Sequence, residues 1–545
     1  MTDDDLTAAA QTVDAAGAVV ERATAHLAAL AEVDGRISVS RLDEHQVLAY
    51  DLAHAASAVA AARVMLDYAT LGDLEADIAR AFIADAAADL GAKLIGREGE
   101  WGTDSTELAA SVPFISAYRD PVFLAGLADR LVGFGTGPAH LSDDFELVQE
   151  TFHRFAEDKI RPVAEHVHRD NTDIPESVIG GLAEIGGFGL SVPEEFGGFA
   201  AGGESDYMGM VVATEELSWG SLGVGGSLIT RPEILTRALV KGGTEEQKQR
   251  WLPDLASGVK MAGVMVTEPD YGSDVAGVKV TANPVEGGYA INGVKTWCTF
   301  AGRANLLMLL VRTDPDRSAG HRGLSMFVVE KESAPGHSFA FAQDGGGTME
   351  GRAIDTLGYR GMHSYEVAFS DWFVPADNLV GLEAGLGRGF YLQMAGFENG
   401  RLQTAARAVG LMQAAYEAAL TYAQERTVFG RPEFDYQLTK VKLARMAVLI
   451  QAGRQFAYAV ARMMANGEGV LEASMVKAYV CRSAEWVTRE AMQIHGGMGY
   501  AEEFAVSRYF VDARVLSIFE GADETLCLRV IARRLAEQAL EATPA

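Results

Sequence analysis

The chain has 545 residues, of which 48% are hydrophobic and 22% are charged. This length is too great for one hydrophobic core, so we expect about three or four domains with large buried interiors. The formal net charge of −29, from 46 basic and 75 acidic residues, excludes nucleic acid and anionic membranes as default partners. A polyanionic ligand would therefore need a local basic patch on this acidic protein.

The three cysteines, Cys298, Cys481 and Cys527, are far apart and form neither a CxxC pair nor a Cys/His motif in the sequence. This spacing excludes zinc-finger-type metal binding and is typical of a reducing compartment. The first residues, MTDDD, lack the basic and apolar parts of a signal peptide. No run approaches the roughly 18 uncharged apolar residues of a membrane span. We therefore expect a cytoplasmic protein without a metal.

The first 130 residues are rich in Ala and poor in Pro, which predicts helices. Apolar residues recur there at helical steps, as at Leu48, Leu52, Ala55 and Val59. The Gly, Pro and Ser residues of segment 133–142 (GFGTGPAHLS) then break the pattern and predict a linker. Asp143 and Asp144 follow, and acidic residues at this point favour the start of a new helix.

Beyond the linker the pattern changes twice. It stays helical to about residue 255 and becomes helical again from about 385 to 537. Between these stretches, β-branched runs separated by Gly, Asn and Pro predict antiparallel strands, for example at 278–282, 306–312, 324–330 and 366–369. We expect four parts: a helical extension (1–132), an α-domain (143–258), a β-domain (259–382) and a helical bundle (383–545).

The extension matches part of the C-terminal helical stretch. Gln46, Leu52, Ala53, Ala56, Ala61 and Arg63 match Gln437, Leu443, Ala444, Ala447, Ala452 and Arg454 without a gap. After six residues missing from the first copy, Glu75, Ala76, Ala81, Ala87, Gly99 and Gly102 match Glu472, Ala473, Ala478, Ala484, Gly496 and Gly499. We interpret the extension as a decayed duplicate, and chance agreement between Ala-rich helix pairs is the alternative.

Several short segments carry a stronger signal when taken in order. They are residues 266–269 (VTEP), 272–274 (GSD), 292–297 (NGVKTW), 425–430 (ERTVFG), 493–497 (QIHGG) and 518–521 (IFEG). Over about residues 143–535 these segments resemble the acyl-CoA dehydrogenase family of flavoenzymes. The resemblance implies an α-domain, a β-barrel-like middle domain and a four-helix bundle, to which the helical extension is added.

The chemistry of this family requires a base, a hydride acceptor and donors to a thioester carbonyl, because α,β-dehydrogenation removes a proton and a hydride. No side chain accepts a hydride, so a cofactor is needed, and the resemblance implies FAD. It also places the base at Glu520. The apolar neighbours Ile518 and Phe519 would desolvate this carboxylate, and Gly521 would let the substrate approach. In isolation, a Glu before a Gly is typical of a surface turn.

Two further positions bear on the base and the substrate. Some relatives place the base one residue before an Arg on an earlier helix, and here Gly400 precedes Arg401, which favours Glu520. Arg401 matches a family residue near the coenzyme portion of the substrate, and its alternative is a helix-surface arginine. Most members have Thr and then Gln two residues on after the Glu-Gly pair. This chain has Ala522, Asp523 and Glu524 there, so the resemblance does not define how the adenosine end is held, although it still places the base.

The resemblance assigns two groups of residues to FAD. Val266, Thr267, Gly272 and Ser273 would line the isoalloxazine and pyrophosphate, with Ser273 also near the substrate, while Trp297 and Thr299 would lie against the ring. Freed N–H groups and hydroxyls are suitable donors to ring carbonyls and phosphate. The alternative for Trp297 is a core aromatic side chain. Arg426, Phe429, Gln493 and Gly497 match residues that reach the FAD of a neighbouring subunit, which implies a homo-oligomer, either a dimer or a tetramer.

The substrate is also implied by resemblance. The extension, with segments 297–303, 359–366 and 394–401, is most similar to family members that oxidise (2S)-methylsuccinyl-CoA to mesaconyl-CoA in the ethylmalonyl-CoA pathway. Electrons would pass to an electron-transferring flavoprotein. Alternatives are another short or branched acyl-CoA, an acyl-CoA oxidase or flavin monooxygenase that uses O2, and an inactive scaffold.

A dicarboxylyl substrate needs a partner for its second carboxylate, because burying that group unpaired is costly. By family resemblance, segment 223–232 helps to form the blind end of the acyl pocket, and its cation is Arg231. The alternative for Arg231 is a solvent-exposed guanidinium at a helix start, with Pro232 at the first helical position.

Overall fold

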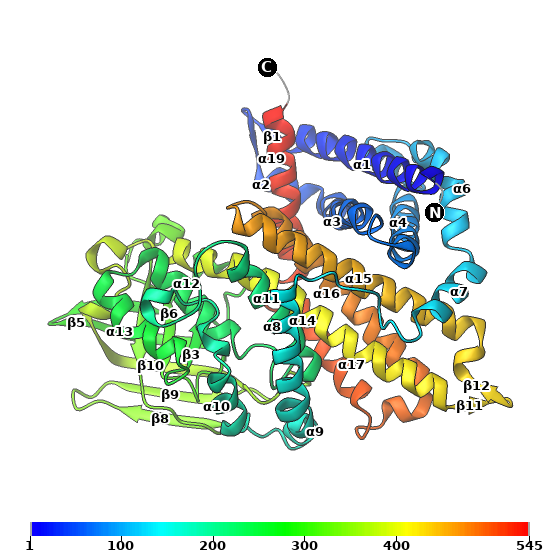
Figure 1. Cartoon of the computed structure of the whole chain (residues 1–545). Helices are drawn as coiled ribbons and strands as arrows, with labels where there is room; N and C mark the ends of the chain where they lie inside the picture. The colour runs from blue at the N-terminus through cyan, green and yellow to red at the C-terminus, as the bar shows by residue number, and fades with distance from the viewer. Residues whose placement is uncertain (1–2, 543–545) are drawn as a thin grey trace. The chain divides into compact units, whose positions relative to one another are not determined.

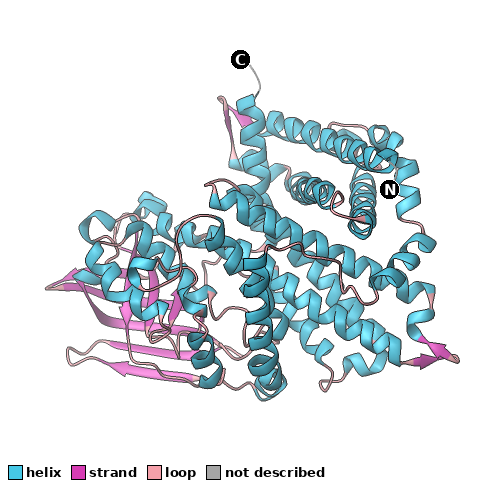
Figure 2. Cartoon of the chain, in the orientation of Figure 1, coloured by secondary structure: helices cyan, strands magenta, loops and turns pink. Residues whose placement is uncertain are grey.

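A computed structural model describes residues 3–542 and divides the chain into two compact units (Figure 1). One, which we call the terminal unit, combines Met1–Asp143 with Thr404–Ala545, and the other, the central unit, is Asp144–Gln403. The helical, β and helical order predicted from the sequence is confirmed (Figure 2). Among the described residues, no helix is long and apolar enough to cross a membrane.

The extension folds into helices of the terminal unit. Its elements are α1 (Asp3–Ala31), β1 (Glu32–Val33), β2 (Arg36–Ile37), α2 (Val39–Glu44), α3 (Gln46–Tyr68), α4 (Asp73–Leu94), α5 (Glu98–Trp101), η1 (Ser105–Ser111), α6 (Val112–Tyr118) and α7 (Pro121–Leu131). The apolar positions that predicted α3 are buried, since Leu48 and Leu52 are 0% exposed. α3 therefore places its apolar face in a core.

The C-terminal helices complete this unit. They are α14 (Gly389–Glu425, from Thr404 onward), the β11–β12 hairpin (Thr427–Val428 and Arg431–Pro432), η9 (Glu433–Asp435), α15 (Gln437–Ala465), α16 (Val470–Ile494), η10 (Gly496–Tyr500), α17 (Ala505–Leu516), α18 (Asp523–Thr525), the π-helical η11 (Leu526–Ala532) and α19 (Arg533–Ala542). In Figure 1, α3 and α4 lie beside α15, and α3 packs against both α15 and α16. The extension and the C-terminal helices thus share one packed interior.

Helix boundaries agree with the repeat proposed from the sequence. α3 begins at Gln46 and α15 at the matching Gln437, while α4 begins at Asp73 and α16 at Val470, which the same alignment pairs. Phe82 and Tyr479, also paired in that alignment, meet edge to face with ring centroids 5.9 Å apart. The first helix pair therefore packs on the second. The duplication itself stays a prediction.

The central unit begins with helices that precede a sheet. They are α8 (Asp143–Phe155, from Asp144 onward), the π-helical η2 (Ala156–Ile160), α9 (Arg161–Asp170), α10 (Glu176–Glu184), η3 (Gly187–Gly189), η4 (Glu194–Phe196), α11 (Glu204–Gly220), α12 (Thr230–Gly242) and α13 (Glu245–Ala256). α13 has a complete capping box, in which the Thr244 side chain accepts the Gln247 N–H and the Gln247 side chain accepts the Thr244 N–H. This local chemistry sets the start of the helix that covers the sheet.

The sheet is curled and, within the described residues, has eight strands in the order β3-β6-β4-β5-β10-β9-β8, with β7 paired to β6. The strands are β3 (Ala262–Met265), β4 (Thr281–Val285), β5 (Gly288–Thr299), β6 (Leu306–Arg312), β7 (Leu324–Glu330), β8 (Ser338–Ala342), β9 (Thr348–Ala353) and β10 (Ser364–Pro375); η5 (Val275–Gly277), η6 (Arg317–Gly323), η7 (Ala376–Asn378) and η8 (Leu382–Gly385) join them or follow β10. β6 and β7 coincide with the predicted runs.

Two strand predictions need correction. β3 pairs with β6 in parallel, and Thr281 of β4 also makes a parallel pair with β6, so the sheet is not wholly antiparallel. The strand predicted at 278–282 begins only at Thr281. The reason is that the N–H groups of Lys279 and Val280 donate to the Glu268 carboxylate, which lies earlier in the chain.

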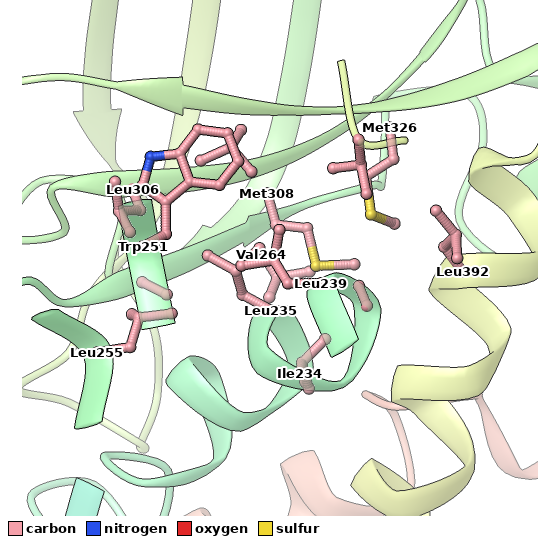
Figure 3. Close-up of a cluster of buried hydrophobic side chains, with 14 of the residues drawn as sticks. Ile234, Leu235, Leu239, Trp251, Leu255, Val264, Leu306, Met308, Met326 and Leu392 are labelled. Carbon is pink, nitrogen blue, oxygen red and sulfur yellow. The ribbon is translucent and has the colours of Figure 1, made fainter. Parts of the chain in front are cut away.

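A buried apolar cluster joins α12 and α13 to the sheet (Figure 3). Leu235 and Leu239 of α12 and Trp251 of α13 meet Val264 of β3 and Met308 of β6 in this cluster. Such close-packed contacts hold the helices on the sheet, and truncating one large member to Ala typically costs about 2–5 kcal/mol. The cluster therefore fixes the end of β3, where the functional loop begins.

Candidate active site

The loop after β3 is tied to β5 by main-chain and side-chain hydrogen bonds. The Thr296 N–H donates to the Thr267 carbonyl at 2.9 Å, and the Lys295 ammonium donates to the Val266 carbonyl at 2.8 Å. Val266 is buried and Thr267 half-buried, whereas Gly272 and Ser273, farther along, are exposed. The loop therefore has a fixed root and an exposed stretch that can meet a ligand.

A buried ion pair stabilises the root of this loop. Lys295 is 0% exposed, and its Nζ lies 2.9 Å from Glu268 Oε1. Burial lowers the pKa of the Lys295 ammonium, and the Glu268 carboxylate opposes that shift. Glu268 also accepts the N–H groups of Lys279 and Val280 at 2.6 and 2.9 Å, so its charge is well satisfied. This pair keeps the two motif segments in register.

The sequence interpretation missed this pair, although both residues lie inside motifs that drew attention to the region. Glu268 is the third residue of segment 266–269, and Lys295 is the fourth residue of segment 292–297. Two opposite charges in otherwise apolar, β-rich segments are a signal for a buried pair, since charged residues are rarely buried without a partner.

Trp297 and Thr299 follow the same strand. The Trp297 side chain is 54% exposed, and its backbone has φ +56°, so the alternative of a core aromatic is wrong. Thr299 is buried, with its Oγ1 3.1 Å from Ser364 Oγ. A half-exposed indole, the accessible backbone at Gly272 and the hydroxyls of Thr267 and Ser273 provide the stacking surface and donors that suit a flavin. FAD therefore fits the residues of this strand and loop.

Glu520 lies in a bent segment of the terminal unit. Its side chain is 8% exposed, and its φ of +54° is unusual for a residue that is not glycine. Gly521 has φ +99°, and a Cβ there would meet nothing closer than Leu526 Cδ1 at 3.8 Å. Within this chain, the backbone conformation is the reason for a glycine here. Close approach by a substrate stays a prediction.

The surroundings of Glu520 differ in part from expectation. The Ile518 side chain is 53% exposed and does not desolvate the carboxylate as expected. Phe519 instead lies beneath the buried Arg407 guanidinium, 5.0 Å from its ring centroid. Lys477, also fully buried, donates from Nζ to the Gly521 carbonyl at 2.6 Å. Neither Arg407 nor Lys477 was predicted, because both come from other helices and carry no local motif.

The residues predicted to reach a neighbouring subunit lie near the ends of α14 and α16. Arg426 follows α14, and Phe429 is 99% exposed with φ +49° at the tip of the β11–β12 hairpin. Gln493 in the last turn of α16 and Gly497 in η10 are also exposed. Tyr422 and His495 stack with ring centroids 4.2 Å apart and connect the two helix ends. The structure thus gathers these residues on accessible segments of one unit.

Arg231 lies in the first turn of α12 and is 6% exposed, so the alternative of a solvent-exposed guanidinium is wrong. The helix begins at Thr230, and Pro232 is its third residue. The Thr230 hydroxyl donates to Gln403 Oε1 at 2.6 Å, which connects α12 to the middle of α14. Arg231 therefore projects from a fixed helix start into protein interior.

Arg401 is half-buried on α14 within the central unit. Burial raises the pKa of Glu398, one turn earlier, and the positive charge of Arg401 opposes this rise. Arg401 thus affects the charge of its own helix, and its half-buried position is compatible with both a substrate contact and a helix-surface arginine.

We call the loop after β3 (residues 266–273), together with Trp297 and Thr299 of β5, the β3–β5 loop. The central unit contains this loop with Arg231 and Arg401, and the terminal unit contains Glu520 with Arg426, Phe429, Gln493 and Gly497. Taken separately, an exposed donor loop with an adjoining indole suits a flavin, and a buried carboxylate on a bent segment suits a general base.

Comparison with known proteins identifies the class. The chain matches the acyl-CoA dehydrogenase N-terminal, middle and C-terminal domains over residues 142–259, 263–372 and 387–536. It is 38% identical to (2S)-methylsuccinyl-CoA dehydrogenase of Cereibacter sphaeroides, over 98% of each chain.

Two solved structures extend the comparison. A glutaryl-CoA dehydrogenase in complex with glutaryl-CoA is 30% identical with a TM-score of 0.66, covering 72% of this chain and 95% of that one. A structure described as an electron transferring flavoprotein of Acidaminococcus fermentans is 29% identical with a TM-score of 0.65, covering 72% and 98%. The chain belongs to the acyl-CoA dehydrogenase family. It is an FAD-dependent oxidoreductase that acts on an acyl-CoA.

Proposed function

We propose that the protein oxidises (2S)-methylsuccinyl-CoA to mesaconyl-CoA. The observation that carries this proposal is the extent of similarity, because the match to the methylsuccinyl-CoA dehydrogenase covers 98% of this chain and so includes most of the extension. By contrast, the match to the glutaryl-CoA dehydrogenase structure covers only 72% of this chain. A buried arginine on α12 adds a chemical argument for a dicarboxylyl substrate.

Glu520 is the proposed base. Its carboxylate takes the proton from the carbon next to the thioester carbonyl, and the electron pair left behind forms the new carbon–carbon double bond. When bound, FAD supplies the acceptor for the hydride that leaves the neighbouring carbon. Low exposure of Glu520 limits competition from water for its carboxylate. The buried Lys477, which donates to the Gly521 carbonyl, helps to hold the strained backbone of this segment in one conformation.

The β3–β5 loop is the proposed holder of the cofactor. Thr267, Gly272 and Ser273 would donate hydrogen bonds to FAD, Val266 would line it, and Trp297 with Thr299 would lie along the ring. Their support is the buried pair of Glu268 and Lys295, which needs no ligand to be satisfied. The site is therefore held in place before the cofactor binds, which lowers the cost of ordering it.

Arg231 is the proposed partner of the substrate's second carboxylate. A guanidinium forms paired, charge-assisted hydrogen bonds with a carboxylate, and these bonds are strong where water is excluded. Arg231 meets this condition because it is 6% exposed. Ser273, Gly521 and Arg401 are the other proposed contacts of the acyl-CoA, with Arg401 toward the coenzyme portion.

We further propose a homo-oligomer, either a dimer or a tetramer. Its support is the exposed group of Arg426, Phe429, Gln493 and Gly497, since an aromatic ring 99% exposed at a hairpin tip suits a partner surface. The protein would act in the cytoplasm, within the ethylmalonyl-CoA pathway, and pass its electrons to an electron-transferring flavoprotein. The similarity to a structure described by that name supports this acceptor.

An anaerobic titration tests the proposed substrate. The purified FAD-loaded protein is mixed with (2S)-methylsuccinyl-CoA, butyryl-CoA, isovaleryl-CoA or glutaryl-CoA, and the oxidised flavin absorbance is followed. We expect methylsuccinyl-CoA to bleach the flavin fastest. Faster bleaching by a monocarboxylic acyl-CoA would contradict the proposed substrate but not the class. Rapid reoxidation by O2 with formation of peroxide would favour the oxidase alternative.

A further inference from the structure

The extension contacts the segment that carries Glu520. Tyr50 and His54, one turn apart on α3, both reach Asp523, which lies three residues after Glu520. The Tyr50 hydroxyl donates to Asp523 Oδ2 at 2.6 Å, and His54 Nε2 lies 3.1 Å from the same oxygen. His54 and Asp523 are 5% and 7% exposed, so these contacts are largely removed from water. All three residues belong to the terminal unit.

Cys527 completes this buried cluster, with its Sγ 3.4 Å from His54 Nε2 and 3.9 Å from Asp523 Oδ1. The arrangement does not suit a nucleophile, because the thiol and the carboxylate face the same ring nitrogen and no relay runs through the imidazole. It does not favour a metal either. Burial raises the pKa of the Cys527 thiol, and the metal ligand is the thiolate.

Hydrogen bonding explains the cluster better than either alternative. Burial opposes ionisation of Asp523, but contacts with His54, Tyr50 and Arg482 hold the pKa of its carboxyl group below the ordinary value. Arg482 also lies over the Tyr50 ring, 5.9 Å from its centroid. An ionised carboxylate with two donors on one oxygen is a strong local anchor.

The anchored segment is one that needs support. Glu520 and Gly521 both have positive φ values, +54° and +99°, and a strained conformation persists only when its surroundings determine it. Lys477 holds the Gly521 carbonyl, and the Asp523 N–H donates to the Ser517 carbonyl at 3.0 Å. The Asp523 side chain anchors the same segment a second time, through hydrogen bonds with Tyr50 and His54 of the extension.

We propose that Tyr50 and His54 are positioning residues that, through Asp523, keep Glu520 in the conformation that removes the substrate α-proton. This inference rests on the proposed function in that Glu520 is the base. It assigns the extension a part in catalysis, beyond covering the C-terminal helices. It also accounts for Asp523 in a segment where this chain departs from the pattern of most family members.

The test compares Tyr50→Phe with Tyr68→Phe in the full-length FAD-loaded protein. Both changes remove one hydroxyl from α3, and Tyr68 donates to the Pro138 carbonyl at 2.9 Å, remote in sequence from Glu520. Flavin reduction by saturating methylsuccinyl-CoA is measured by stopped flow, with substrate that carries either hydrogen or deuterium on the α-carbon. We expect Tyr50→Phe to slow reduction about tenfold or more, with a larger isotope effect and unchanged FAD content and substrate dissociation constant. Tyr68→Phe should match the wild type.

A second pair of variants, at His54, tests the same contact in case Tyr50→Phe folds poorly. His54→Gln retains a donor for Asp523 and His54→Leu does not, so reduction should be faster in the former. Equal reduction rates in Tyr50→Phe, Tyr68→Phe and wild type would overturn the inference, as would equal slowing in both tyrosine variants. A wild-type protein whose flavin no acyl-CoA reduces would instead overturn the proposed function itself.

Discussion

The β3–β5 loop and the Glu520 segment achieve a fixed geometry in different ways. In the loop, the supporting residues Glu268 and Lys295 lie 27 positions apart and inside the motifs that they support. In the Glu520 segment, the hydrogen bond from Tyr50 to Asp523 spans 473 positions. The residues proposed to hold the cofactor are thus supported from nearby motif positions, whereas the segment of the proposed base is contacted by a part of the chain outside the family's domain matches.

Replacing Glu520 by Gln should have the largest effect, because it removes the proposed base and leaves the loop of the central unit intact. We expect flavin reduction by substrate to fall about 10²–10⁴-fold, the usual range for loss of a general base. FAD content, measured by absorbance after gel filtration, should match the wild type. A variant that reduces its flavin at near wild-type rate would show that the base lies elsewhere.

Replacing Lys295 by Met tests the other side of the comparison. The change leaves Glu268 buried without its cation, which typically costs about 3–5 kcal/mol of stability. We expect a lower Tm and loss of FAD. The matched double variant Lys295→Met with Glu268→Gln removes both charges and should recover part of the loss. If the single variant kept wild-type Tm and full FAD, the buried pair would not be the anchor of the loop.

Replacing Arg231 by Met should change the preference between acyl-CoA substrates more than the ability to oxidise an acyl-CoA at all. Loss of the buried cationic partner should weaken binding of the substrate's second carboxylate by at most about 3–5 kcal/mol. The kcat/KM for methylsuccinyl-CoA should therefore fall strongly. Butyryl-CoA has no second carboxylate and should be affected little. The measurement is kcat/KM on both substrates. Equal losses on the two, or no loss on either, would contradict the assignment of Arg231.

The smallest effect concerns pH. Burial lowers the pKa of His495, so folding favours the neutral ring. Between that lowered value and the ordinary pKa of about 6.5, the unfolded chain binds the proton more readily, and stability falls as pH drops through this window. The stability that the neutral His495 ring gives the folded state is fully present above the ordinary pKa of about 6.5. His495→Gln should therefore show a flatter decline in the free energy of unfolding from pH 7 to 5, by denaturant titration. An unchanged slope would exclude this titration.

Much of the fold follows from local pattern. Residues 306–312 and 324–330 alternate or run apolar over strand lengths and match β6 and β7. The start of β4 was displaced because a distant carboxylate, Glu268, takes the N–H groups that a strand would use. Periodicity reports which face is apolar, and it does not report which side chain will pair with a given N–H group.

The site is predictable to a lesser degree and for the same reason. The motif segments indicated the loop, Glu520 and the exposed helix ends, because these short segments occur along the chain in the same order as in the family. Burial of Arg231 and exposure of Ile518 were not evident, since one residue in a helix-start pattern and one in an apolar run look ordinary locally. The contacts of Asp523 with Tyr50 and His54 arise only from tertiary packing.

The most direct measurement for the whole account is a single anaerobic turnover of the FAD-loaded protein with (2S)-methylsuccinyl-CoA. Flavin absorbance is recorded together with chromatographic identification of the product. We predict loss of oxidised flavin and formation of one equivalent of mesaconyl-CoA per flavin, with both absent in Glu520→Gln. Oxidised flavin that persists with methylsuccinyl-CoA unchanged, or a product other than mesaconyl-CoA, would contradict it.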